Sequence, residues 1–137
     1  MANDFRKTQA AVKAELDALA PLFNSGYLYI YDSTYPDGTT AALTTQSQIV
    51  RLTFNTTAFS TGAVGYPCTI TANAITAANS TFSSTATWYR ATGSSTGTAL
   101  VQGTVGTASA DLVLNATAIS SGASVSVSSY VINGYTS

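Results

Sequence analysis

The spacing of apolar residues divides the chain into a helical start and a long β-rich remainder. Within residues 1–20 the large apolar residues recur at the spacing of one helix face: Phe5, Val12, Leu16 and Leu19. Asn3 or Asp4 could cap this helix, and Pro21 is expected to end it because proline has no amide hydrogen to donate. We therefore predict one N-terminal α-helix over residues 1–20.

After Pro21 the pattern changes to short alternating runs separated by glycine-rich turns. The runs predicted to be strands are 27–31, 49–54, 68–75, 82–91, 99–102, 110–114 and 125–132. Two buried faces are expected, one formed by Val50, Leu52 and Phe54 and one formed by Phe82, Ala86 and Trp88. About seven or eight short strands of this kind are typical of an antiparallel β-sandwich or jelly roll. We predict a mainly β protein, with the helix in 1–20 and a β-sandwich domain in 21–137.

Composition narrows the possible functions more than any motif does. Only 8% of the residues are charged, and five basic against six acidic side chains leave a net charge of −1. A protein that binds nucleic acid by neutralising phosphates needs a basic surface, so that function is excluded. The chain has no His, which removes the usual acid–base residue of enzymes and most zinc sites. We expect a protein that is not an enzyme and that carries no cofactor.

The remaining candidates for chemistry are few. Asp32 and Asp37 lie in one loop, but Tyr and Pro stand where a calcium loop places its ligands, so we interpret the loop as a polar turn with no metal. Cys68 is the only cysteine and has no His to activate it, so we expect it to be a small core residue.

Two sets of residues are predicted to form interfaces. The helix stripe of Phe5, Val12, Leu16 and Leu19 must pack on its own β-domain or on a neighbouring subunit, and we predict that it forms an interface with another subunit. Tyr27, Tyr29 and Tyr31 share one face of the first strand, where they could stack on a sugar or on a partner protein. The alternative, which the pattern slightly favours, is that the helix or a second sheet covers these tyrosines.

Arg90 and Asp111 are two of only five charged residues after residue 20, and both lie in predicted strands. Arg90 should share the face of Trp88, and a buried guanidinium needs a carboxylate. We predict that Arg90 and Asp111 form a partly buried pair that joins two strands. The alternative, held about equally, is that both charges are solvated and unrelated.

The first residues contain too many charges for a secretory signal, and no apolar run approaches the length of a membrane helix. We therefore expect the chain to remain in the cytosol in which it is made, with no membrane partner.

Several segments together resemble a known protein family. They are the run from Leu16 to Leu19, the run from Asn24 to Pro36, with Ser33 in place of a usual glycine, then 85–90, 97–98, 103–106 and 110–115, and finally Ile119, Gly122 and 125–129. This pattern, which extends over almost the whole chain, is similar to that of small virion proteins of tailed bacteriophages, associated with head genes. The resemblance implies a jelly-roll cement or decoration protein. Such a protein would be assembled in the host cytoplasm, bind the major capsid protein at the virion surface and form a homodimer or homotrimer. A host-recognition module that binds carbohydrate and a neck or tail connector are the alternatives.

Overall fold

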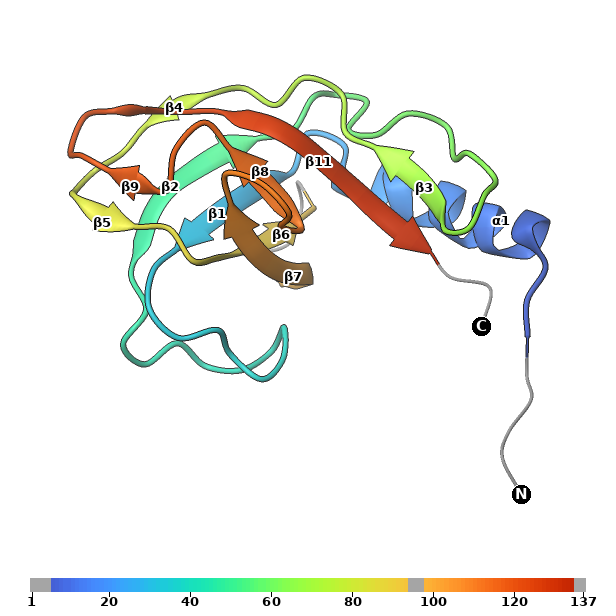
Figure 1. The fold of residues 1–137 in the computed structure, drawn as a ribbon, viewed down its shortest axis with the longest axis horizontal. Helices are drawn as coiled ribbons and strands as arrows, with labels where there is room; N and C mark the ends of the chain where they lie inside the picture. The colour runs from blue at the N-terminus through green and yellow to red at the C-terminus, as the bar shows by residue number, and fades with distance from the viewer. Residues whose placement is uncertain (1–5, 94–97, 135–137) are drawn as a thin grey trace.

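The computed structural model describes residues 6–93 and 98–134 and shows a mainly β chain with one α-helix (Figure 1). Helix α1 covers Gln9–Leu19 and continues into a 3-10 turn, η1, at Ala20–Phe23. The strands are β1 Tyr27–Tyr31, β2 Gln48–Thr53, β3 Cys68–Thr71, β4 Ala78–Asn79, β5 Ser84–Thr85, β6 Trp88–Thr92, β7 Ala99–Gly106, β8 Leu112–Leu114, β9 Ala118–Ile119, β10 Ser124–Val125 and β11 Val127–Gly134.

The strands form one large sheet and two small ones. The large sheet has seven strands in the order β2-β1-β6-β7-β8-β11-β3, and the small sheets pair β10 with β4 and β5 with β9. Neighbouring strands are antiparallel except β7 and β8, which run parallel. The large sheet is therefore mixed, and the prediction of a wholly antiparallel arrangement is wrong at this one pair.

Neither edge of the large sheet is left bare. Along β2, the amides of Thr76 and Thr81 donate to the carbonyls of Thr53 and Ile49 at 3.0 and 3.2 Å. Along β3, the amide of Ser60 donates to the carbonyl of Thr71 at 2.9 Å. Irregular segments therefore protect both edges from pairing with other chains, as native sheets commonly require.

The helix packs against β3 and β11 and shares the core of the sheet. Val12 is 1% exposed and Leu16 is 6% exposed, and both belong to the same hydrophobic cluster as residues of the large sheet. Leu19 is partly buried against that cluster, whereas Phe5 lies outside the described residues. The prediction that this stripe contacts another subunit is wrong for Val12 and Leu16, because their apolar surface is already buried within this chain.

The start of the helix also differs from the prediction. Thr8 is the N-cap, and its hydroxyl oxygen accepts a hydrogen bond from the amide of Ala11 at 3.1 Å. The helix begins at Gln9, later than the predicted start at residue 1, and the candidate caps Asn3 and Asp4 lie outside the described residues. Pro21 lies in the first positions of η1, where the chain leaves the α-helix as expected.

Of the two predicted buried faces, one is confirmed. Val50, Leu52 and Phe54 are all at most 3% exposed. The second is wrong because the run 82–91 breaks between β5 and β6. Ala86 belongs to the core cluster, but Trp88, although 0% exposed, lies outside it on the opposite face of the sheet, where it stacks on Tyr31.

Candidate functional site

The face of β1 and β6 that points away from the core carries the tyrosines of the first strand. The register pairs Tyr27 with Thr92, Tyr29 with Arg90, and Tyr31 with Trp88. Side chains directly opposite each other on antiparallel strands lie on the same face. The sheet therefore places three tyrosines, a tryptophan and a guanidinium together on a single surface, which we call the tyrosine face.

Part of the tyrosine face has a structural role. The rings of Tyr31 and Trp88 are stacked, with centroids 4.3 Å apart and planes inclined by 15°. The indole nitrogen of Trp88 donates to the carbonyl of Asp32 at 2.9 Å. Burial raises the pKa of the Tyr31 phenol because the charged form would lose its solvation. Tyr31 and Trp88 are thus packed residues and offer little free ring surface.

The element that covers these rings is the loop from Asp32 to Ser47. Neither the helix nor a second sheet does so, in contrast to the expectation. Side chains of β6 and β7 donate to carbonyls of this loop: Trp88 to Asp32, Gln102 to Pro36, and Arg90 to Gly38 and Ala41. The loop covers the end of the face at Tyr31. Tyr27 and Tyr29 remain half-buried, and the guanidinium of Arg51 lies 4.4 Å from the ring centre of Tyr27.

Arg90 is held without any carboxylate partner among the described residues. Its Nη2 donates to the carbonyl oxygens of Gly38 at 3.1 Å and Ala41 at 2.8 Å. Its Nε donates to Oε1 of Gln102 at 3.2 Å, and the guanidinium carbon lies 5.1 Å from the ring centre of Trp88. The guanidinium is therefore fixed in place, and its positive charge is not neutralised by an ion pair.

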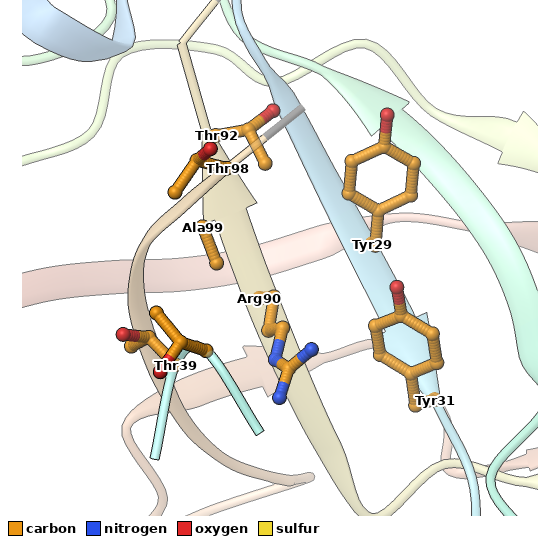
Figure 2. Close-up of a pocket in the computed structure, with 8 residues that line it drawn as sticks. Tyr29, Tyr31, Thr39, Arg90, Thr92, Thr98 and Ala99 are labelled. Carbon is orange, nitrogen blue, oxygen red and sulfur yellow. The ribbon is translucent and has the colours of Figure 1, made fainter. Parts of the chain in front are cut away.

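A hollow of about 370 Å³ opens beside this guanidinium (Figure 2). Its lining combines the side chains of Tyr29, Tyr31 and Arg90 with threonines of three segments, Thr39, Thr40, Thr92 and Thr98. Figure 2 shows the two tyrosine rings along β1, with Arg90 between Tyr31 and Thr39. The hydroxyl of Thr92 is buried and makes no hydrogen bond to another described residue.

This arrangement has the groups needed to bind a small ligand. Among the described residues that line it, the ionisable side chains are two phenols and a guanidinium. An aromatic ring, a fixed cation and several hydroxyls are suited to a hydroxyl-rich or anionic small molecule. The hollow is the best-formed candidate binding site on the tyrosine face.

The loop that contains Asp32 and Asp37 is a structural turn. The Asp32 carboxylate accepts hydrogen bonds from the amide of Ser47 and the hydroxyl of Ser84, both at 2.7 Å. The pKa of Asp32 is lowered because these hydrogen bonds outweigh the effect of burial. Asp37 is exposed, and no group of three potential metal ligands occurs in residues 6–93 and 98–134.

The predicted pair between Arg90 and Asp111 is wrong. Asp111 accepts hydrogen bonds from the amide and the hydroxyl of Thr104, at 2.9 and 3.1 Å. Arg90 points into the tyrosine face and uses carbonyls and Gln102 instead. Because backbone carbonyls can satisfy a guanidinium as well as a carboxylate can, the shortage of acidic residues did not force the pairing.

A pair of tyrosines that the sequence did not predict lies on the core side of the sheet. Tyr89 donates its hydroxyl to that of Tyr130 at 2.9 Å, and the rings meet edge to face with centroids 5.3 Å apart. Burial raises the pKa of Tyr89 to about 12 and that of Tyr130 well above its ordinary value. Alternation puts Tyr89 on the face opposite Trp88 and Arg90, but the Trp88 face was the one expected to be buried, so the sequence predicted neither the burial of Tyr89 nor its long-range contact with Tyr130. Cys68 is likewise buried in the core, as predicted.

Comparisons with protein families, curated proteins and solved structures found no match for this chain. In the described part of the chain, no helix has both the length and the apolar character needed to cross a membrane.

Proposed function

We propose that the protein is a non-enzymatic structural component of a bacteriophage virion that binds and stabilises the major capsid shell as a cement or decoration protein. Two arguments support this: the sequence resemblance to small phage head proteins, and the physical character of the surface. In this proposal the protein acts at the capsid surface, and it contacts both the shell and further copies of itself.

The observation that carries the proposal is the scarcity of surface charge. After residue 20 only Asp37, Arg51 and Asp111 are exposed charged residues, whereas 23 Thr and 17 Ser dominate the polar composition of the chain. Soluble monomers usually have about 25–35% charged residues at their surface. A neutral hydroxyl-rich surface suits a protein present in many identical copies, because it removes the electrostatic repulsion between them.

We also propose that the fold is a β-sandwich of the jelly-roll type expected from the resemblance. The large sheet would form one layer, and the two small sheets would form the other. Support comes from the shared core, which includes Ile119 of β9, Val125 of β10 and, at its margin, Ala78 of β4. Residues of both small sheets thus bury apolar surface on the same cluster as the large sheet.

The decisive experiment is quantitative mass spectrometry of purified virions of the source phage. A cement protein should be present in a fixed ratio to the shell protein, on the order of hundreds of copies, as repeated symmetric contacts require. A copy number of tens or fewer would contradict the proposal and favour a fibre or connector. Absence from the particle would contradict any virion role.

A second experiment locates the contact face. Single Glu substitutions at exposed hydroxyl residues on different segments, Thr56, Thr85 and Ser129, place one charge on each surface in turn. A buried interface disfavours an unpaired charge, so the substitution in the contact face should abolish binding to particles that lack the protein. The other two serve as matched controls and should bind normally.

The hollow on the tyrosine face favours one alternative, a host-recognition module that binds carbohydrate. The Tyr29 ring could stack on a sugar while Arg90 and the threonines bind its hydroxyls. Tyr29→Ala should then abolish binding to a glycan array, and Tyr66→Ala, which truncates an 82% exposed ring elsewhere, should not. Absence of glycan binding by the unaltered protein would exclude this alternative.

A further inference from the structure

Strand β8 lies between β7 and β11 in the large sheet but is shorter than both, and this leaves a gap between the two long strands. Strand β8 has three residues, whereas β7 and β11 have eight each. It pairs with β7 only at Val105 and Gly106 and with β11 only up to Tyr130. On the N-terminal side of Leu112, the first residue of β8, no strand of the described residues pairs with both β7 and β11.

In the described part of the chain, the edge of β7 that faces the gap carries backbone groups that no neighbouring strand pairs with. Val105 donates its amide to Thr87, so alternate residues of β7 direct their amides towards β6 and the residues between them point outwards. Gln102 and Thr104 are such outward residues. Thr104 donates its amide to the Asp111 carboxylate at 2.9 Å, whereas Gln102 has no strand partner on this side.

The edge of β11 that faces the gap also carries backbone groups that no described strand pairs with. The Tyr130 carbonyl accepts the Ala72 amide at 2.9 Å, which directs the backbone groups of Tyr130 and Ile132 towards β3. Asn133 lies between these positions in the alternation, and its amide and carbonyl point away from β3. Because β8 does not extend this far, Asn133 has no strand partner on the gap side among residues 6–93 and 98–134.

Between the two edges lies a hollow of about 270 Å³. The lining includes the tyrosines Tyr89 and Tyr130, together with Val101 and Ile132, which pack on the core cluster. Asp111, at one end, is the only charged residue among the described residues that line it. The hollow thus offers an apolar floor, two unpaired strand edges and one negative charge.

We propose that this gap binds an extended segment of another polypeptide chain, which inserts as a strand between β7 and β11. The segment would continue the line of β8, parallel to β7 and antiparallel to β11, and would pair with Gln102 on one side and Asn133 on the other. An apolar side chain would lie on the tyrosine floor, and a Lys or Arg would lie near Asp111. This inference does not depend on whether the partner is a capsid protein.

The experiment uses a capped peptide of about six residues, a usual strand length, with alternating Val and Thr and a Lys at one end. Amide hydrogen exchange of the full-length protein is followed by NMR. We expect a saturable slowing of exchange at Gln102 and Asn133, with a Kd of about 1 mM or tighter. A peptide methylated at every second backbone nitrogen has lost those donors and should give no slowing. No saturable effect, or equal binding of the methylated peptide, would overturn the proposal.

Two matched comparisons, one of protein variants and one of peptides, test which groups of the gap recognise the inserted segment. Asn133→Pro removes the outward amide and should abolish binding, whereas Asn133→Thr keeps the amide and should bind normally. A peptide with Glu in place of Lys should bind more weakly than the Lys peptide. That difference should disappear in Asp111→Asn, which keeps an acceptor for Thr104. Slowing of exchange at sites remote from the gap would also overturn the proposal, even if Asn133→Pro fails to fold.

Discussion

Arg90 illustrates how a charge-poor protein can hold a half-buried cation. Its hydrogen bonds go to two loop carbonyls and one amide side chain, so no acidic residue is needed. Hydrogen bonds that involve a charged group contribute more than neutral ones, about 1.5–3 kcal/mol. The guanidinium therefore fastens the loop from Asp32 to Ser47 onto the tyrosine face and shapes the hollow beside Tyr29.

The first prediction concerns that fastening. Arg90→Met should lower the free energy of unfolding by about 2–3 kcal/mol, because it removes charge-assisted hydrogen bonds and leaves the Gly38 and Ala41 carbonyls without this donor. Denaturant titration measures the effect. Arg51→Met is the matched control, since exposed Arg51 only lies over Tyr27, and it should cost about 1 kcal/mol or less. Equal costs for the two variants would contradict the role given to Arg90.

The second prediction concerns Tyr89 and Tyr130, whose phenols have raised pKa values because both are buried. The unfolded chain loses these protons near pH 10, whereas folded Tyr89 keeps its proton to about pH 12. The contribution of Tyr89 is thus complete below pH 10 and is lost as the pH rises towards 12, and that of Tyr130 begins to be lost from the same lower limit near pH 10. In that window the free energy of unfolding should fall by about 1.4 kcal/mol per pH unit for each tyrosine.

Denaturant titration at a series of alkaline pH values measures this slope. In the double variant Tyr89→Phe and Tyr130→Phe, the part of the slope due to the pair should be absent. Tyr66→Phe, which alters a tyrosine that is 82% exposed, should leave that part in place. An unchanged slope in the double variant would mean that the pair does not control alkaline unfolding.

At the scale of elements, the sequence predicts the strands whose apolar residues alternate regularly. The run Tyr27–Tyr31 was predicted with its correct bounds, because strict alternation and a preceding glycine leave little ambiguity. The run 82–91 was predicted as one strand but is interrupted at Ala86 and Thr87. Neither residue is a glycine, proline or asparagine of the kind that marks a turn, so the local pattern carries no signal for that break.

The candidate site was predictable only in part for a related reason. Alternation placed Tyr27, Tyr29 and Tyr31 on one face, and the structure confirms that arrangement. The element that covers this face is an irregular loop, which has no periodicity to reveal its position. Its contacts with Arg90 and Gln102 join residues about fifty or more positions apart, and no local pattern predicts contacts of that range.

The third prediction concerns helix α1, whose buried residues make it part of the core. Leu16→Ala should lower the free energy of unfolding by about 2–5 kcal/mol because it opens a cavity against the strands. Ala14→Ser, on the exposed side of the same helix, is the control and should cost about 0.5 kcal/mol or less. Both are measured by chemical denaturation. A Leu16→Ala variant as stable as the control would restore the view that the helix serves another subunit.

At the scale of the molecule, one hydrophobic cluster connects the helix, the large sheet and the small sheets. It extends from Val12 in α1 through Leu28 in β1 to Ile119 in β9. The opposite side of β6 carries the only tryptophan, covered by the loop from Asp32 to Ser47. Core and tyrosine face are therefore two sides of the same strand, and disruption of either should affect the other.

The final prediction follows from that shared strand. Unfolding monitored by Trp88 fluorescence, which reports the tyrosine face, should coincide with unfolding monitored by far-ultraviolet circular dichroism, which reports the whole sheet. Both transitions should keep their midpoint in a chelator, because the Asp32 carboxylate is held by Ser47 and Ser84. An earlier fluorescence transition would mean that the covering loop opens independently of the sheet. A midpoint lowered by several degrees in chelator and restored by calcium would instead identify the loop of Asp32 and Asp37 as a metal site.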